Sequence, residues 1–345
     1  MSVCLGKTKL LVAVASVLTL TTLSACGSGT GGKPSGGSGV TSPPSLTKIT
    51  FATTWVTPDF EDLPIWVAIE KGYYREAGLD VRVIYPPSTT TAPKLIATDT
   101  ANIGYVETPG VLEAVQQHAP IKVIAGVWQK NAQALVGKPG TKIDPTKFAG
   151  KTFVTFAGPG NVASMNEILH YAGLKMSDIK VIIAQSSNIN LMLAGKANYA
   201  LNAAPYGIAE VEAATGKLPA LLMTSAMGLR QYPQTAYAGN TTWMAKHPNA
   251  TRKWVAATLK AVQYAVANPA AAVSLYVKAT GNAGGGQAYS SAGWGGVIPL
   301  LNGPNGLFRM NNNQWTTLEA ALTAGGAFSG SVPPSSVYTN EYIPQ

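Results

Sequence analysis

The sequence predicts an α/β protein with two lobes, each built around a doubly wound and mostly parallel sheet. Three observations lead to this fold class. Segments typical of strands alternate with segments typical of helices, as expected for repeated βα units. The alternation pauses around Asp144 and Pro145 and then begins again, which indicates a second series of units. The length of 345 residues also suits about two domains of ordinary size.

The first lobe is expected to begin with residues 47–138. Its strands are short runs that are rich in β-branched or aromatic residues, or in which apolar and polar residues alternate. We expect these strands at 49–55, 79–85, 101–105 and 121–127. The helices between them are expected at 63–71, 93–97 and 109–117. Asp62 and Pro64 are typical of the start of the first helix, and Gly72 is typical of its end.

The second lobe is expected at residues 139–230, and the rest of the chain is expected to return to the first lobe. The same signals predict strands at 152–156, 180–184, 199–202 and 218–223, and helices at 162–171, 189–194 and 206–214. Within 231–345, an apolar stripe from Val255 to Val266 predicts a long helix, and 270–278 predicts another. The glycine-rich segment 281–296 predicts a loop.

The first 46 residues are typical of an export signal followed by a tether. Lys7 and Lys9 precede an apolar run, 10–20, which is too short to span a bilayer. Leu23-Ser24-Ala25-Cys26 resembles a bacterial lipobox, so we expect residues 1–25 to be removed and Cys26 to be lipidated. The alternative is an ordinary secretory signal with a chance cysteine. Residues 26–46, rich in Gly, Ser and Pro, predict a flexible linker.

These signals predict an extracytoplasmic protein that is anchored by lipid to the bacterial cell membrane. Cleavage would remove Lys7, Lys9 and Cys4, which lowers the formal net charge from +9 to +7 and leaves a single cysteine. A disulfide framework is therefore excluded. The composition, 46% hydrophobic and 12% charged, excludes a disordered chain. No run of five or more Lys or Arg occurs, so we expect no nucleic-acid partner.

One segment of the first lobe resembles a known family. The run LPIWVAIEKGYY at 63–74, followed by EAGLDV at 76–81, resembles the opening of the solute-binding proteins of ABC importers. The branch it resembles is the thiamine-pyrimidine-synthase-like group, which includes nitrate, sulfonate and taurine binders. Residues 101–105 resemble that group's third strand, with Asn102 where Asp is usual, and 268–272 resemble its late helices. The order and spacing of these matches extend the resemblance over about 48–345.

This resemblance implies a type II periplasmic-binding fold with a hinge between two lobes. The chain would cross to the second lobe near 136–144 and return near 227–237. The ligand would lie in the cleft between the lobes, which closes by hinge motion. The implied partners are a small-molecule ligand and the permease and ATPase subunits of the importer. We expect a monomer without a cofactor or a metal.

Candidate ligand-binding residues follow from the strand ends, because open α/β sheets bind ligands at the carboxyl ends of their strands. The candidates are Trp55, Asp59, Ser88, Tyr105, Glu107, Thr108, Trp128, Gly158, Gly160, Asn161, Asn202 and Tyr206. Gly158 to Asn161 also open a predicted helix, whose N–H groups suit a polar or anionic group. Packing in a lobe core is the alternative role for the aromatic residues, and a solvated loop is the alternative for the acids.

The candidate set is aromatic, amide and acidic, and no Lys or Arg follows a strand of the first lobe before Lys130. Nitrate, a sulfonate or taurine would favour a cationic pocket. Aromatic faces with a carboxylate instead suit a flat, neutral or cationic heterocycle. An aminopyrimidine fits, and the thiamine-precursor branch of the resembled family binds one. Riboflavin, nitrate, sulfonate and taurine remain the alternatives.

An enzyme is the rival from another class, because the eukaryotic pyrimidine synthase of the resembled group shares this fold. That enzyme consumes its own histidine and has an iron site and a cysteine-rich motif. Here one cysteine follows the cleavage site, and His118, His170 and His247 share no metal-ligand spacing. We therefore expect a binding protein and no enzyme. A surface lipoprotein that senses a ligand or binds a partner without transport stays open as a third possibility.

Overall fold

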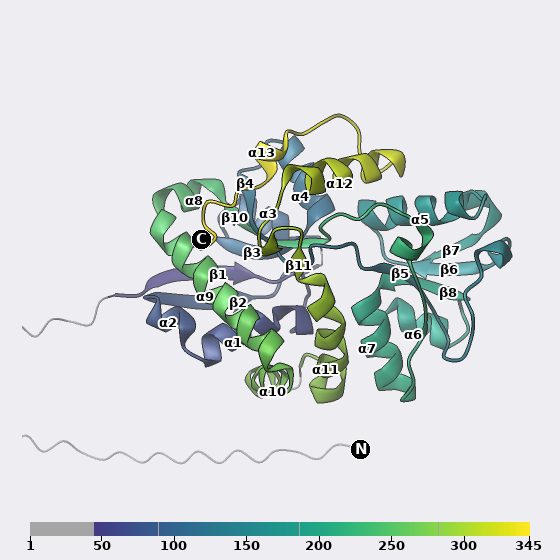
Figure 1. The fold of residues 1–345 in the computed structure, drawn as a ribbon, viewed down its shortest axis with the longest axis horizontal. Helices are drawn as coiled ribbons and strands as arrows, with labels where there is room; N and C mark the ends of the chain where they lie inside the picture. The colour runs from purple at the N-terminus through teal and green to yellow at the C-terminus, as the bar shows by residue number, and fades with distance from the viewer. Residues whose placement is uncertain (1–44, 89, 186, 282) are drawn as a thin grey trace, which may run out of the picture. The chain divides into compact units, whose positions relative to one another are not determined.

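Two five-stranded sheets with the same strand pattern organise the folded part of the chain (Figure 1). The computed structural model describes residues 45–345 except 89, 186 and 282. The predicted signal peptide, Cys26 and nearly all of the predicted linker lie outside the described residues. The described residues form one compact unit. Among the helices of the described residues, none combines the length and the hydropathy that a membrane span requires.

The first sheet has the strand order β2-β1-β3-β10-β4. Its strands are β1 Thr47–Ala52, β2 Leu79–Ile84, β3 Ile103–Glu107, β4 Ile121–Gly126 and β10 Thr235–Asn240. The strand β10 is antiparallel to both of its neighbours, β3 and β4, while β1 is parallel to β2 and β3. Four of the five strands therefore run the same way.

The second sheet repeats this pattern with the order β7-β6-β8-β5-β9. Its strands are β5 Gln133–Gly137, β6 Thr152–Thr155, β7 Lys180–Ile183, β8 Tyr199–Ala203 and β9 Ala220–Met223. Here β5 is the antiparallel strand, between β8 and β9. The two sheets confirm the predicted α/β class with two lobes and mostly parallel sheets.

The antiparallel strands β5 and β10 are absent from the sequence prediction. Because β5 belongs to the second sheet, the chain enters the second lobe by residue 133, earlier than the predicted crossing at 136–144 and the predicted boundary at 138. Its residues Ala134, Leu135 and Val136 are all buried. A strand that is buried on both faces lacks the alternation of apolar and polar residues by which strands are recognised.

Helices cover both faces of each sheet (Figure 1). Those of the first lobe before the crossing are α1 Leu63–Glu70, α2 Tyr73–Glu76, α3 Ala92–Ala97 and α4 Thr108–Gln116. The second lobe has α5 Pro159–Tyr171, α6 Asn188–Leu193 and α7 Ala204–Thr215. After the return come α8 Thr241–Lys246, α9 Pro248–Ala267, α10 Pro269–Thr280, α11 Gly286–Val297, α12 Asn312–Ala324 and α13 Pro334–Val337.

Short elements fill the connections. They are the single 3-10 turns η1 Phe60–Asp62, η2 Pro145–Lys147, η3 Met176–Asp178, η4 Thr224–Met227 and η5 Ile298–Leu300, and the two-residue strands β11 Asn302–Gly303 and β12 Gly306–Leu307. Of these, η1 matters most for the candidate site, because it follows β1 and contains two acidic residues.

Two segments, 127–132 and 228–234, connect the lobes and are hydrogen-bonded to each other. The Gln234 N–H donates to the Trp128 carbonyl at 2.8 Å, and the Val127 N–H donates to the Thr235 carbonyl at 3.0 Å. The Gln234 side-chain oxygen accepts from the Ala132 N–H at 2.7 Å. The two connections are therefore paired through Gln234 at the end of the second segment, and we refer to them together as the connecting ribbon.

Aromatic rings fill the core of the first lobe around Trp254 on α9. This side chain is fully buried, and its ring stacks on Phe51 at 5.7 Å and on Tyr74 at 6.2 Å between centroids. It also meets Tyr237 edge-on at 5.2 Å. The rings come from β1, α2, β10 and α9, so one side chain ties together elements that lie about 200 residues apart in the chain.

The predicted glycine-rich loop at 281–296 was wrong for most of its length, because α11 occupies Gly286–Val297. Glycine lowers helix propensity, which is why the sequence indicated a loop. In the structure two of these glycines allow close approach. A Cβ atom at Gly293 would lie 2.3 Å from the Phe60 ring, and one at Gly296 would lie 3.0 Å from the Pro205 Cα on α7.

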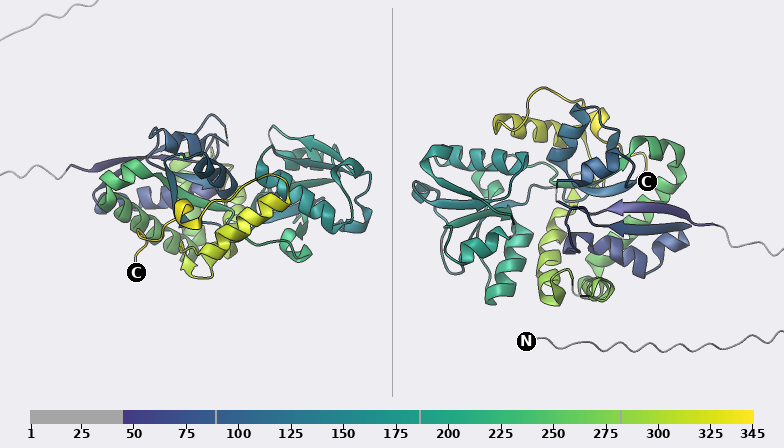
Figure 2. Two further views of the ribbon diagram at one scale, coloured as in Figure 1. Left: turned by 90° about the horizontal axis from the view of Figure 1, so that it is seen from above. Right: turned by 180° about the vertical axis from the view of Figure 1, so that it is seen from behind.

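The helix α11 belongs to the first lobe but packs against α7 of the second lobe (Figure 1). Figure 2 shows that α12 likewise reaches α5, where a Cβ atom at Gly325 would lie 2.4 Å from the Ala163 Cα. In both places a glycine in one lobe faces a helix of the other lobe. The structure therefore shows the lobes in contact on both flanks of the connecting ribbon.

We expect Gly296→Ala to loosen the contact between the lobes, while Gly295→Ala does not. The added methyl group at residue 296 meets the Pro205 backbone, and overpacking of this kind costs about 1–3 kcal/mol. At residue 295 a Cβ atom has no neighbour within 4 Å, so alanine should stabilise α11 by about 0.5–1 kcal/mol. Urea unfolding measures both changes. Equal effects of the two substitutions would contradict this role of Gly296.

Candidate ligand-binding site between the two lobes

The segment after β1 buries three acidic side chains within four residues. Asp59 precedes η1, and its carboxylate Oδ1 accepts the Glu61 N–H at 3.2 Å. The Asp62 carboxylate in turn accepts the Asp59 N–H at 3.4 Å. All three side chains are buried. We refer to Asp59, Glu61 and Asp62 as the carboxyl cluster.

Asp59 joins three elements that are far apart in the sequence. The Tyr206 hydroxyl on α7 donates to Asp59 Oδ1 at 2.9 Å. The Tyr289 hydroxyl on α11 donates to Asp59 Oδ2 at 3.2 Å. Because α7 belongs to the second lobe, the hydrogen bond from Tyr206 crosses the boundary between the lobes.

Aromatic rings surround the carboxyl cluster on the cleft side. The Trp55 ring lies 5.2 Å from the Tyr206 ring and 6.5 Å from the Phe156 ring, both of which belong to the second lobe. The Trp55 indole N–H donates to Glu61 Oε2 at 3.1 Å. The Phe60 ring packs 4.6 Å from that of Tyr206. Trp55 is only partly buried, so part of its side chain is in contact with solvent.

Burial raises the pKa of each acid in the carboxyl cluster. For Asp59 the loss of hydration outweighs the hydrogen bonds from Tyr206, Glu61 and Tyr289 and raises the pKa to about 6. Burial also raises the pKa of Glu61 and Asp62 well above their usual range, and the charge of Asp59 raises both further.

No lysine or arginine of the described residues forms an ion pair with the carboxyl cluster. The ion pairs of the described residues are Lys147–Asp144 and Lys260–Glu76, and neither includes a member of the carboxyl cluster. Buried carboxylates without a cation nearby are costly unless they hold a proton or accept hydrogen bonds. The cluster therefore favours a ligand group that donates hydrogen bonds or carries positive charge.

The pKa of Asp59 predicts a pH dependence of stability. Its pKa of about 6 in the folded chain lies above the ordinary 3.8, so the folded state binds the proton more tightly. This carboxyl is therefore expected to destabilise the fold as pH rises from about 4 to 6, by about 3 kcal/mol in total. In urea unfolding, the unaltered chain should lose stability over that range relative to Asp59→Asn, which does not titrate at this position. The free energy of unfolding of Asp59→Asn minus that of the unaltered chain should therefore become more positive. A difference that is constant between pH 4 and 7 would contradict the raised pKa.

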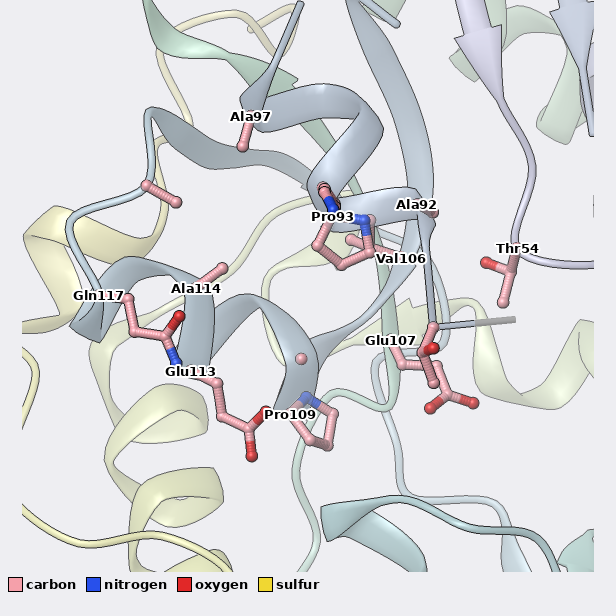
Figure 3. A pocket seen from close by; sticks show the side chains of 14 residues that line it. Thr54, Ala92, Pro93, Ala97, Val106, Glu107, Pro109, Glu113, Ala114 and Gln117 are labelled. Carbon is pink, nitrogen blue, oxygen red and sulfur yellow. The ribbon is translucent and has the colours of Figure 1, made fainter. Parts of the chain in front are cut away.

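A cavity of about 380 Å³ lies between α3 and α4 (Figure 3). Thr54 and Glu107, which follow or end strands β1 and β3, line one end of it. Thr54 directly precedes Trp55, whose indole N–H donates to Glu61, so this end of the cavity lies on the side of the carboxyl cluster. Glu107 itself reaches water, yet the surrounding protein removes part of its hydration and raises the pKa of its carboxyl. The volume is at the lower end for small-molecule sites.

Several of the predicted site residues come together at this place. Tyr206 contacts both Trp55 and Asp59, and the Trp128 ring lies 6.2 Å from that of Tyr206. Glu107 lines the cavity.

The predicted turn Gly158 to Asn161 also lies at the lobe boundary. A Cβ atom at Gly160 would lie 3.2 Å from the Pro109 ring, which lines the cavity. The Asn161 side-chain oxygen accepts from the Gln133 amide at 3.4 Å. Gly158 has a φ of 133°, a conformation that favours glycine, and directly precedes α5.

Four predicted residues use their polar groups elsewhere. The Tyr105 hydroxyl is hydrogen-bonded to that of Thr235 at 2.7 Å, and the Thr108 hydroxyl donates to the Gln234 carbonyl at 3.2 Å. The Asn202 amide donates to Asn188 at 2.9 Å. The Ser88 hydroxyl is hydrogen-bonded to that of Thr91 at 2.6 Å, outside the carboxyl cluster. These contacts stabilise the lobes and the connecting ribbon.

Sequence reasoning missed Glu61 and Tyr289 as site residues, and it included Phe156 only for the backbone of the turn Phe156 to Asn161, not for its ring. Glu61 follows strand β1, so the rule of strand ends could have found it. Tyr289 carries no such signal, because it lies on the helix that was predicted as a loop. No group of three or more His, Cys, Asp or Glu in the described residues is arranged to hold a metal ion.

Two lobes with matching mixed sheets, a two-stranded connection and a site between them define a type II periplasmic-binding fold. The chain belongs to the NMT1/THI5-like family, whose model matches residues 59–272. Solved structures support the fold. The ligand-binding component of an ABC-type import system from Staphylococcus aureus is 7% identical, with a TM-score of 0.67 over 86% of this chain and 98% of that one. The alkanesulfonate-binding protein SsuA from Xanthomonas axonopodis is 12% identical, with a TM-score of 0.64 over 86% and 99%.

Curated relatives include both enzymes and binding proteins. The 4-amino-5-hydroxymethyl-2-methylpyrimidine phosphate synthase THI13 of Saccharomyces cerevisiae is 22% identical over 68% of this chain and 71% of its own. The riboflavin-binding protein RibY of Chloroflexus aurantiacus is 23% identical over 97% of this chain and 98% of its own. The match to RibY thus extends over nearly the whole of both proteins.

Proposed function

We propose that this chain is the extracytoplasmic solute-binding component of an ABC importer and is anchored by a lipid on Cys26. Its ligand would be a small planar nitrogen heterocycle, with a thiamine-related aminopyrimidine as the first candidate. The full-length similarity to a riboflavin-binding protein and the fold shared with import components support the transport role. The permease and ATPase of the importer would be its partners.

One observation carries the choice of ligand class. The carboxyl cluster follows β1, Glu107 ends β3, and none of these four acids has an ion pair with Lys or Arg in the described part of the chain. The rings of Trp55, Phe156 and Tyr206 lie beside the carboxyl cluster, where Trp55 donates to Glu61 and Tyr206 donates to Asp59. A flat ring with an amino group matches both features, because the ring stacks on an aromatic face and the amino group donates to a carboxylate.

Glu107 and Trp55 are the residues we assign to direct contact with the ligand. Both have surface that solvent reaches, and Glu107 lines the cavity beside Thr54. Asp59 and Tyr206 would act on the other event, the closing of the lobes, because their hydrogen bond joins the first lobe to α7, while Tyr289 holds the second oxygen of Asp59 within the first lobe. Ligand binding and lobe closure would thus use neighbouring carboxyls.

The size of the cavity favours a one-ring ligand, and riboflavin is the second candidate. About 380 Å³ is small for a three-ring flavin with its sugar chain, but it suits a substituted pyrimidine. Riboflavin nevertheless has the flat ring that Trp55 can stack, and RibY is similar over its full length. Nitrate, sulfonates and taurine fit less well at the end of the cavity that Glu107 lines, because each would place an anion near several carboxyls; Lys94 also lines the cavity.

We infer binding without chemical conversion, although THI13 and related synthases belong to the similar proteins. The histidines lie at the ends of helices: His118 after α4, His170 in the last turn of α5 and His247 between α8 and α9. None of them contacts the carboxyl cluster through a hydrogen bond in the described residues. A synthase of this kind makes the pyrimidine phosphate and consumes its own histidine, so the intact mass of the protein should stay unchanged on incubation and no pyrimidine phosphate should form. A loss of mass at a histidine, or release of the pyrimidine phosphate, would overturn this inference.

A thermal-shift panel on the chain from residue 26, with Cys26→Ser, tests the proposal. The panel contains 4-amino-5-hydroxymethyl-2-methylpyrimidine, thiamine, riboflavin, taurine, an alkanesulfonate and nitrate. A ligand at 100 times its dissociation constant stabilises the folded state by about 2.7 kcal/mol. We expect the pyrimidine to give the largest shift. A shift with taurine, sulfonate or nitrate alone would keep the transport role and overturn the ligand class, and no shift with any compound would overturn the proposed ligand set.

A further inference from the structure

Lysines gather at the edge of the second sheet that lies away from the cleft. The parallel strands β6, β7 and β8 begin at this edge, and the antiparallel strand β5 ends there. The helices α5, α6 and α7 end at the same edge, because each follows a strand that runs toward the cleft. The lysines at these strand ends and in the adjoining loops are Lys138, Lys142, Lys147, Lys151, Lys175, Lys180, Lys196 and Lys217. We call this set the distal lysines.

Backbone pairing places several distal lysines beside one another. The Lys180 N–H donates to the Lys151 carbonyl at 2.9 Å, where β6 and β7 begin. The Lys138 ammonium lies 3.7 Å from the position of a Cβ atom at Gly195, next to Lys196. Figure 1 shows the loop that leads from β5 to β6 at the end of the second sheet that points away from the first sheet.

The distal edge carries a clear excess of positive charge. Its acidic residues are Asp144, Asp178 and Glu212, so eight lysines face three acids. Within the described residues, one distal lysine forms an ion pair, Lys147 with Asp144. The carbonyl ends of α5, α6 and α7 attract the lysines that follow these helices. This attraction does not explain the lysines next to strand ends, among them Lys138 after β5 and Lys151 before β6.

An exposed leucine lies within this basic edge. Leu218 is 65% exposed, more than any other large hydrophobic side chain of the described residues. Gly137 pairs with Ala220 at the start of β9, so Leu218 lies close to the end of β5 and to Lys138. A leucine gains free energy at the boundary between lipid headgroups and acyl chains, whereas a nucleic acid offers it no apolar partner. All eight basic residues are also lysines, not the arginines that suit bidentate contacts with nucleic-acid phosphates.

We propose that the distal lysines and Leu218 bind the surface of a membrane that contains anionic phospholipids. Clusters of four to eight basic residues on one surface typically create this affinity. The proposal concerns the outer edge of the second lobe, so it does not depend on the ligand of the cleft. It assigns a surface role to the positive net charge, which the acidic site between the lobes does not use.

Vesicle co-sedimentation tests this proposal with the chain from residue 26, in which Cys26→Ser removes the lipidation site. We expect binding to vesicles of phosphatidylcholine with phosphatidylglycerol, weak binding to phosphatidylcholine alone, and a loss of binding as salt rises above about 0.15 M. The triple variant Lys138→Gln/Lys142→Gln/Lys196→Gln should bind anionic vesicles roughly 100-fold more weakly, about fivefold for each lysine. Leu218→Ser should weaken binding without changing its salt dependence.

The control removes the same charge from the first lobe. Lys246, Lys253 and Lys278 are exposed on α8, α9 and α10, and their joint change to Gln should leave vesicle binding within about twofold. Equal loss in the two triple variants would overturn the proposal, because net charge alone would then explain binding. Binding to single-stranded DNA that is tighter than binding to anionic vesicles would also overturn it, as would the absence of any difference between the two kinds of vesicle.

Discussion

An aminopyrimidine will bind to Glu107→Gln about 10- to 150-fold more weakly than to the unaltered chain. The substitution keeps the size of the side chain but removes the charge that we propose as the acceptor for the amino group of the ligand, and a hydrogen bond to a charged group contributes about 1.5–3 kcal/mol. Glu107 is suited to this test because it ends β3, lines the cavity and reaches water. Isothermal titration calorimetry with 4-amino-5-hydroxymethyl-2-methylpyrimidine measures the change.

Glu113→Gln is the matched control for this experiment. Glu113 lines the same cavity, and Figure 3 shows Glu107 and Glu113 on either side of Pro109. Burial also raises its pKa. We expect the affinity of Glu113→Gln for the aminopyrimidine to stay within about threefold of that of the unaltered chain, because Glu113 lies farther along α4 from the carboxyl cluster. Equal losses for the two variants would show that the cavity as a whole, and not the end near the cluster, binds the amino group.

Trp254→Ala will lower the free energy of unfolding by about 3–5 kcal/mol. The ring is fully buried and packs against Phe51, Tyr74 and Tyr237, so alanine leaves a cavity that these rings cannot close. A loss of this size is a large part of the stability of an ordinary domain, 5–15 kcal/mol. Urea unfolding followed by circular dichroism measures it.

Trp254→Phe separates packing from polarity at this position. Phenylalanine keeps an aromatic ring for stacking and removes the indole N–H, which has no hydrogen-bond partner in the structure. We expect it to cost clearly less than alanine, because less volume is lost and no hydrogen bond is broken. If both variants destabilise the chain equally, the contribution of Trp254 does not come from its stacked rings.

Local sequence patterns predicted the elements whose two faces differ in polarity. The helix α9 shows its apolar stripe, and β2 alternates, so both could be recognised without a structure. The strands β5 and β10 are buried throughout or nearly so, and their patterns carry no alternation. The helix α11 is hidden for a different reason, because the glycines that let it approach α7 and Phe60 are the same residues that indicate a loop.

The candidate site could be predicted only in part, for a similar reason. The rule of strand ends selected Trp55, Asp59 and Tyr206, which the structure brings together. It could not separate them from Tyr105 and Asn202, whose polar groups bind inside one lobe. The direction of a side chain beyond a strand end depends on the turn that follows, and contacts such as Asp59 with Tyr206 join residues 147 positions apart.

The ribbon formed by residues 127–132 and 228–234 has a mechanical consequence for the capture of a ligand. The backbone hydrogen bonds join these segments where Val127 and Trp128 meet Gln234 and Thr235, so we expect any rotation of one lobe against the other to pivot near these residues. A rotation about such a fixed pivot would break and re-form the hydrogen bond between Tyr206 and Asp59 Oδ1 at the same place. The position that Tyr206 takes relative to Asp59 would then depend on a segment that contributes no carboxyl group to the site.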